Sequence, residues 1–144
     1  MHDWLYTYET LAEGQALPPL RSEVTPAFVA DYRRAIGEPP DTASTHGAAP
    51  SHDAALTDVP PAIVTIFTTN VMGRSGIDRP SGGIHFKHSY RHLAPIALGA
   101  TIVTTGQVAR KFLRDGRKVL VFETACRDEA RGPVAECTVT MIYP

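Results

Sequence analysis

The hydrophobic pattern of the chain centres on the stretch from Pro60 to Met72, which is apolar on almost every side. It has no polar face wider than residues 68–70, whereas a surface helix carries a broad charged face, so a helix here would be buried. Prolines at its start suit the first turn of a helix, where a backbone N–H is not needed. Its β-branched residues would also allow a strand, but everything after it has a strand pattern. We therefore predict a buried central helix at about residues 60–73, wrapped by a curved antiparallel sheet.

A second, shorter helix is predicted earlier in the chain. Thr25 is a good N-cap and Pro26 suits the first helical position. The apolar face of this helix would consist of Phe28, Val29, Tyr32 and Ile36. Gly37 would end it. The prolines at positions 18 and 19 exclude a helix interior over residues 17–20.

From His85 onward the apolar period changes from helical spacing to two, which indicates strands. On the first strand, this alternation places His88 and His92 on one face, together with Phe86 and Tyr90. The same alternation makes His85 point away from them.

Three further strands are predicted at residues 100–113, 118–127 and 134–143, the first of them broken at Gly106. The pair Asp115-Gly116 between two strand patterns is a strong hairpin signal. Four consecutive strands with hairpin connections predict an antiparallel sheet. The pattern as a whole indicates one α+β domain over residues 1–144, with helices early and strands late.

Composition excludes several classes of protein. The chain is 43% apolar and 20% charged, with a net charge of −1, so it has no basic footprint for nucleic acid or an anionic membrane. The first ten residues do not resemble a signal peptide, and no apolar run is long enough to span a membrane. Cys126 and Cys137 have no metal or redox spacing and are expected to be buried free thiols. We expect a cytoplasmic protein without a cofactor.

The order of these elements resembles a known family. The matching segments are residues 8–40 (YETLAEGQALPPLRSEVTPAFVADYRRAIGEPP), residues 85–108 (HFKHSYRHLAPIALGATIVTTGQV) and residues 137–143 (CTVTMIY). They resemble MaoC-like hydratases and dehydratases, which have the hotdog fold, and above all the dehydratase-like half at the N-terminus of two-hotdog enzymes. That half often lacks the catalytic pair. Residues 38–59 match the family least.

This resemblance implies a substrate that is a coenzyme A or acyl-carrier-protein thioester of a 2-enoyl or 3-hydroxyacyl group. It implies addition or removal of water by an Asp and a His separated by four residues, because hydration needs a positioned base and acid. The backbone N–H groups of Ala62, Ile63 and Val64, at the start of the central helix, would stabilise the developing enolate. The resemblance also implies a partner fold, as a homodimer or as a heteromer with a second hotdog subunit.

The catalytic pair departs from the family pattern of Asp, Asn-Pro and His. Aligned without gaps after Gly37, Glu38 takes the place of the Asp and Ala43 that of the His, which would remove the His. If the alignment is shifted by three residues, Asp41 and His46 restore the family spacing of an Asp and a His separated by four residues. These two residues are therefore either the catalytic pair or solvated loop residues of a fold that only binds or scaffolds. His52 and Asp53 form a similar adjacent pair in the same loop.

The histidines at positions 85, 88 and 92 are the other candidates. No metal site is predicted, since no cysteine or carboxylate lies among them. In one interpretation they are histidines of the sheet face near a pocket mouth. In the other, His85 or His88 lines the acyl tunnel and contacts the thioester as an alternative acid or base.

Three functions remain open at this point. The chain is a hydro-lyase acting on acyl thioesters, a non-catalytic acyl-CoA-binding subunit that needs a catalytic partner, or a thioesterase of the same architecture. Fold alone does not choose among them.

Overall fold

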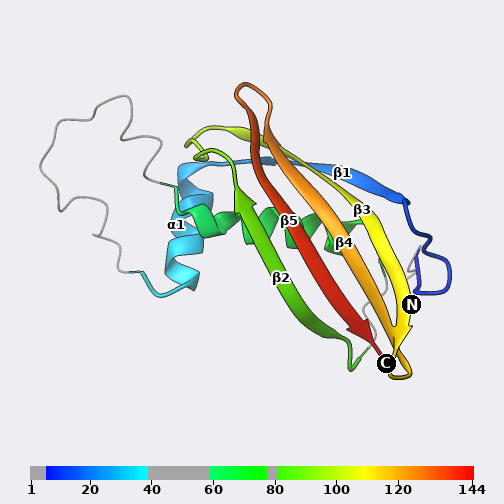
Figure 1. The fold of residues 1–144 in the computed structure, drawn as a ribbon. Helices are drawn as coiled ribbons and strands as arrows, with labels where there is room; N and C mark the ends of the chain where they lie inside the picture. The colour runs from blue at the N-terminus through cyan, green and yellow to red at the C-terminus, as the bar shows by residue number, and fades with distance from the viewer. Residues whose placement is uncertain (1–5, 39–58, 78–80) are drawn as a thin grey trace, which may run out of the picture.

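The computed structural model describes residues 6–38, 59–77 and 81–144. One five-stranded antiparallel sheet, in the order β1-β3-β4-β5-β2, curves across a single long helix (Figure 1). The elements in chain order are β1 (Ala16–Glu23), α1 (Pro26–Ala35), the 3-10 turn η2 (Pro61–Ile63), α3 (Val64–Arg74), β2 (Ile84–His92), β3 (Thr101–Arg114), β4 (Arg117–Asp128) and β5 (Gly132–Tyr143). The predicted α+β class is confirmed.

The central helix is buried as its sequence predicts. η2 and α3 together cover residues 61–74, and Ile63, Phe67 and Val71 are all at most 1% exposed. The ring of Phe67 packs against Phe28 of α1, with 5.8 Å between the ring centroids. An apolar helix of this length is stable in water only when other elements cover it, and here the sheet and α1 do so.

The topology of the sheet differs from the predicted run of four consecutive strands joined by hairpins. β3, β4 and β5 form a meander, but β2 pairs with β5 at one edge of the sheet and β1 pairs with β3 at the other. The strand β1 was missed because of its two prolines, which an edge strand tolerates. The hairpin at Asp115-Gly116 is confirmed: both residues have positive φ, 51° and 75°, as a tight two-residue turn requires.

Strand β3 runs without a break through Gly106, so the predicted interruption there is wrong. The irregularity in its pairing with β4 lies instead between Val108 and Arg110. A Cβ atom at Gly106 would lie 3.3 Å from side-chain atoms of both Leu17 and Thr124, and 3.6 Å from Val71 of α3. Glycine therefore serves here to bring the strand close to its neighbours rather than to end it.

Helix α1 begins and ends as predicted. The Thr25 hydroxyl accepts a hydrogen bond from the N–H of Phe28 (3.1 Å), and Gly37 has a positive φ of 79°. Phe28, Val29 and Tyr32 pack against the core. Ile36 was predicted on the same apolar face, but it is 52% exposed, because the helix has already ended at Ala35.

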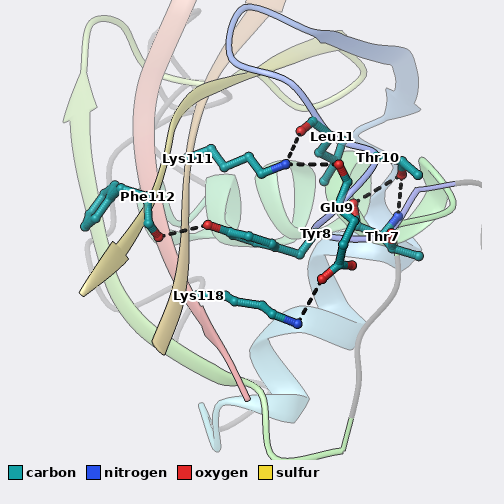
Figure 2. Close-up of polar contacts among 8 residues, drawn as sticks. All are labelled: Thr7, Tyr8, Glu9, Thr10, Leu11, Lys111, Phe112 and Lys118. Carbon is teal, nitrogen blue, oxygen red and sulfur yellow. Dashed lines mark hydrogen bonds and ion pairs between the residues drawn. The ribbon is translucent and has the colours of Figure 1, made fainter. Parts of the chain in front are cut away.

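The segment before β1 is fastened to the ends of β3 and β4 (Figure 2). The Lys111 ammonium donates to the carbonyl oxygens of Glu9 (3.1 Å) and Leu11 (2.8 Å), and it lies 4.8 Å from the centre of the Tyr8 ring. The Tyr8 hydroxyl donates to the carbonyl of Phe112 (3.0 Å), and Lys118 pairs with the Glu9 carboxylate (2.9 Å). These contacts close the far end of the core, away from α1.

Candidate active site

Four aromatic rings lie in a row on the face of β2 that meets α3, and we call them the ring ladder: His85, His88, Tyr90 and His92. Neighbouring ring centroids are 5.1, 4.1 and 6.2 Å apart along the row. The predicted shared face of His88 and His92 is confirmed, because Tyr90 stacks on both.

Two predictions for this strand are wrong, and a β-bulge explains both. The pairing with β5 shifts between His85 and Lys87, which leaves Phe86 as the extra residue. The bulge brings His85 onto the His88 side, where alternation alone would have kept it away. It also keeps Phe86 off that face: this ring is 61% exposed and lines a groove of about 430 Å³ with Phe112.

The middle of the ring ladder is hydrogen-bonded to polar residues of α3. His88 Nε2 lies 3.3 Å from the Thr68 hydroxyl, and His88 Nδ1 lies 2.8 Å from the Tyr90 hydroxyl. The Tyr90 hydroxyl donates in turn to Thr65 Oγ1 (2.8 Å). Sequence reasoning missed both threonines. The signal that could have identified them is their spacing of three positions, which puts both hydroxyls on one side of a mostly apolar helix.

His88 is neutral at physiological pH. Burial is the main reason that its pKa falls from the ordinary 6.5 to about 4, and the charge of nearby His85 adds to the effect. Burial also raises the pKa of Tyr90. Both residues therefore stay uncharged at neutral pH, and the hydrogen bond between them joins two neutral groups.

We expect the free energy of unfolding to fall by about 1–2 kcal/mol as the pH drops from about 6.5 to about 4, after allowance for solvent screening of a half-buried group. The sign follows from proton binding: over this range the unfolded chain protonates His88, while the native chain, with its pKa of about 4, does not. Urea unfolding at several pH values, compared with His88→Gln, checks this. His92→Gln, at an exposed histidine of the same strand, should keep the wild-type slope.

An apolar pocket opens beside the ring ladder, between the C-terminal half of α3 and the sheet. Its volume is about 300 Å³, at the lower end of the range for small-molecule pockets. Its lining residues are Thr69, Met72, Ile77, Gly83, His85, Phe122, Met141 and Tyr143. Because α3 rises about 1.5 Å per residue, Thr65 and Thr69 are only about 6 Å apart along its axis. The hydrogen-bonded residues around Thr65 therefore lie about one helical turn from the lining of this pocket.

The predicted donors at the start of the central helix lie directly before Thr65 in the chain. Within residues 6–38, 59–77 and 81–144, no side chain caps η2 or α3. The N–H of Ile63 donates to the carbonyl of Pro60 (3.0 Å), and that of Val64 donates to carbonyls within η2. Ala62, which is exposed, is therefore the best placed of the three to donate to a ligand.

The predicted pair Asp41 and His46, and the second pair His52 and Asp53, lie outside the described residues. Both ends of their loop are described, and they reach the same end of the molecule: α1 leads into the loop, and η2 follows it (Figure 1). Glu38, which the ungapped alignment puts in the place of the Asp, pairs with Arg33 of α1 (3.4 Å).

The remaining candidates for chemistry are weaker. Burial raises the pKa of Cys137 to about 12 and also raises that of Cys126, so neither thiol is a nucleophile at neutral pH. Across residues 6–38, 59–77 and 81–144, no group of three or more ligating side chains could hold a metal ion. A larger groove of about 770 Å³ follows the outer face of the sheet, with polar side chains such as Gln107 and Glu123. No helix in those same ranges is long and apolar enough to cross a membrane.

Comparison with solved structures identifies the architecture. The MaoC-like dehydratase of Rhodospirillum rubrum is similar over 93% of each chain, with a TM-score of 0.68 and 15% identity. The R-hydratase PhaJ1 of Pseudomonas aeruginosa matches over 95% of this chain and 84% of its own (TM-score 0.69, 14% identity). The 3R-hydroxyacyl-ACP dehydratase complex HadBC of Mycobacterium tuberculosis matches over 91% and 96% (TM-score 0.64, 18% identity).

No protein-family model and no curated protein sequence matches the chain. The structural likeness nevertheless confirms the predicted hotdog fold, and it confirms at the level of the fold the resemblance to MaoC-like hydratases and dehydratases. Identities of this size leave the chemistry to be argued from the site itself.

Proposed function

We propose that the protein is a hydro-lyase that adds water to, or removes it from, a short acyl thioester of coenzyme A or an acyl-carrier protein. The observation that carries the proposal is the nearness of two features along α3. A pocket of about 300 Å³, lined by Thr69 and Met72, offers room for an acyl chain, and the hydrogen-bonded residues at Thr65 offer neutral groups for a thioester carbonyl. The solved structures that are similar to this fold include a 3R-hydroxyacyl-ACP dehydratase and two R-hydratases, which supports this chemistry.

Proton transfer is assigned to Asp41 and His46. The loop that carries them joins α1 to η2, and α3 with Thr65 follows directly after η2. Hydration needs a base that takes a proton from water and an acid that protonates C2, and a carboxylate with an imidazole can hold one water for both.

A second hotdog fold is proposed as the partner, paired through the β2 edge. Among the strands that the structure describes, β2 pairs with β5 alone and lies at the edge of the sheet. The edge carries two exposed apolar side chains, Ile84 (46%) and Phe86 (61%). Unpaired edges of this kind are templates for pairing with another strand. The neighbour HadBC is itself a complex.

The experiment is hydration of crotonyl-coenzyme A by the purified protein alone, followed by loss of the enoyl absorbance. We expect wild-type activity, and a loss of at least ~100-fold in Asp41→Asn and in His46→Ala, the usual scale for removal of an acid or a base. His52→Ala, in the same loop, is the matched control and should retain activity.

Two other results would change the assignment. A protein that binds the thioester without hydrating it would be the non-catalytic subunit, which the missing Asn-Pro after Gly37 also favours. Release of free thiol without loss of the enoyl group would identify a thioesterase.

A further inference from the structure

Building on the proposed function, we infer that Tyr90 is a further catalytic residue, whose hydroxyl donates a hydrogen bond to the thioester carbonyl, and that His88 is its positioning residue. Neither belongs to the Asp41 and His46 pair. The inference is carried by the hydrogen-bonded row of His88, Tyr90, Thr65 and Thr68 beside the acyl pocket.

The Tyr90 hydroxyl lies at the start of α3. Tyr90 Oη lies 2.8 Å from Thr65 Oγ1, in the first turn of α3, which begins at Val64. The His88 ring stacks on Tyr90 with 4.1 Å between the ring centroids, and it also contacts the tilted ring of His85, at 5.1 Å. His85 lines the apolar pocket. An acyl chain in that pocket would direct its thioester along the ring ladder toward Tyr90.

The hydrogen bonds between Thr68, His88 and Tyr90 can run in either direction. Neutral His88 carries one N–H, so the row has two complete arrangements. In one, Thr68 donates to Nε2, Nδ1–H donates to Tyr90, and the Tyr90 proton points at Thr65. In the other, Tyr90 donates to Nδ1, and Nε2–H donates to Thr68, whose proton goes to the Val64 carbonyl (3.1 Å).

Only the first arrangement offers the Tyr90 proton to a ligand. A carbonyl oxygen in place of Thr65 Oγ1 would accept that proton and select this arrangement. The imidazole thus changes tautomer, and no charge moves into or out of the row. This is what makes His88 a positioning residue: it decides whether the Tyr90 hydroxyl donates to the helix side or to the imidazole itself.

The donor becomes more effective as the reaction proceeds. Attack of water at C3 places negative charge on the thioester oxygen, and a fixed donor binds that enolate more strongly than the neutral carbonyl. The proton stays on Tyr90 throughout, because burial raises the pKa of this phenol. No bond to Tyr90 forms or breaks. Loss of one such donor typically lowers kcat by about 10²–10³-fold.

The first test is Tyr90→Phe, which keeps the ring and removes one oxygen. We expect kcat for crotonyl-coenzyme A to fall by about 10²–10³-fold, with KM changed by less than about threefold, since the interaction strengthens only in the transition state. The matched control is Tyr8→Phe, which removes a hydroxyl hydrogen-bonded at 3.0 Å to Phe112 at the other end of the core. It should keep the wild-type kcat.

The role of His88 is tested by a pair of variants. His88→Phe keeps a stacked ring without nitrogen and should lower kcat about tenfold or more, whereas His88→Gln, whose amide can donate to Tyr90, should restore part of it. Equal loss in both variants would mean that the imidazole only packs, and would overturn the positioning role.

A second readout does not depend on turnover. Difference infrared spectra of bound butyryl-coenzyme A, labelled with ¹³C at the carbonyl, should show a lowered C=O frequency that returns toward its value in water in Tyr90→Phe. If the wild type shows this shift but hydrates no crotonyl-coenzyme A, the inference stands and the hydro-lyase proposal fails. Equal frequencies, or full activity in Tyr90→Phe, would overturn the inference. Failure to bind either thioester would overturn both.

Discussion

Replacing Phe67 by alanine is expected to lower the free energy of unfolding by about 3–5 kcal/mol, the range for a large aromatic removed from a packed core. Phe67 is fully buried on the central helix, and its ring packs against Phe28, so the cavity would open between α3 and α1. Domains of this size are stable by about 5–15 kcal/mol, so the change would remove a large share of the total. Urea unfolding followed by circular dichroism measures it.

The comparison variant is Leu113→Ala, at an apolar side chain that is 68% exposed. It should change the unfolding free energy by no more than about 0.5 kcal/mol, as surface substitutions usually do. Similar losses in both variants would show that Phe67 does not occupy the packed interior.

Gly106→Leu is expected to cost about 3 kcal/mol, the upper part of the range for overpacked cores. The Cβ alone would already lie 3.3 Å from Leu17 and Thr124, and the remaining atoms would push toward Val71 of α3. The expected result is a lower midpoint of thermal unfolding, with Gly106→Ala much less affected than Gly106→Leu, because only the tips of two side chains must give way for a single methyl.

Ala125→Leu provides the matched control, on the neighbouring strand β4. Ala125 is exposed on the outer face, in the broad groove, where a larger side chain has room. Its midpoint should stay close to that of the wild type. If Gly106→Leu were as stable as Ala125→Leu, the close approach of β3 to the helix would be wrong.

Most of the fold could be predicted because its signals are local. An apolar helix with no polar side, an Asp-Gly turn and a Thr-Pro helix start each specify their own element. The predictions that failed concern features that depend on the position of a strand in the sheet. Two prolines hide the strand character of Ala16–Glu23, which is allowed only because β1 is an edge. The pairing of β2 with β5 joins segments about 50 residues apart, which no local pattern encodes.

The site was predictable only in part, for the same reason. His88 was identified, but one extra residue in the pairing at Phe86 decides that His85 faces the same way. Period-two reasoning cannot detect a bulge. Tyr90 was predicted to share a face with His88 and His92, and its hydroxyl gained significance when the structure placed it 2.8 Å from Thr65 Oγ1 and 2.8 Å from His88 Nδ1. The assignment of Asp41 and His46 still rests on spacing in the sequence.

The order of the strands also has a consequence during synthesis on the ribosome. The helix α3 ends at Arg74, but the strands that cover it, β3 to β5, are complete only at Tyr143, about 70 residues later. At roughly 5–20 residues per second, the nascent chain carries an apolar helix without its sheet for about 4–14 s. Over that interval this segment is the part of the chain most exposed to aggregation, and the part that a chaperone would bind. Early termination between α3 and β5 should therefore yield insoluble fragments rather than a partly folded core.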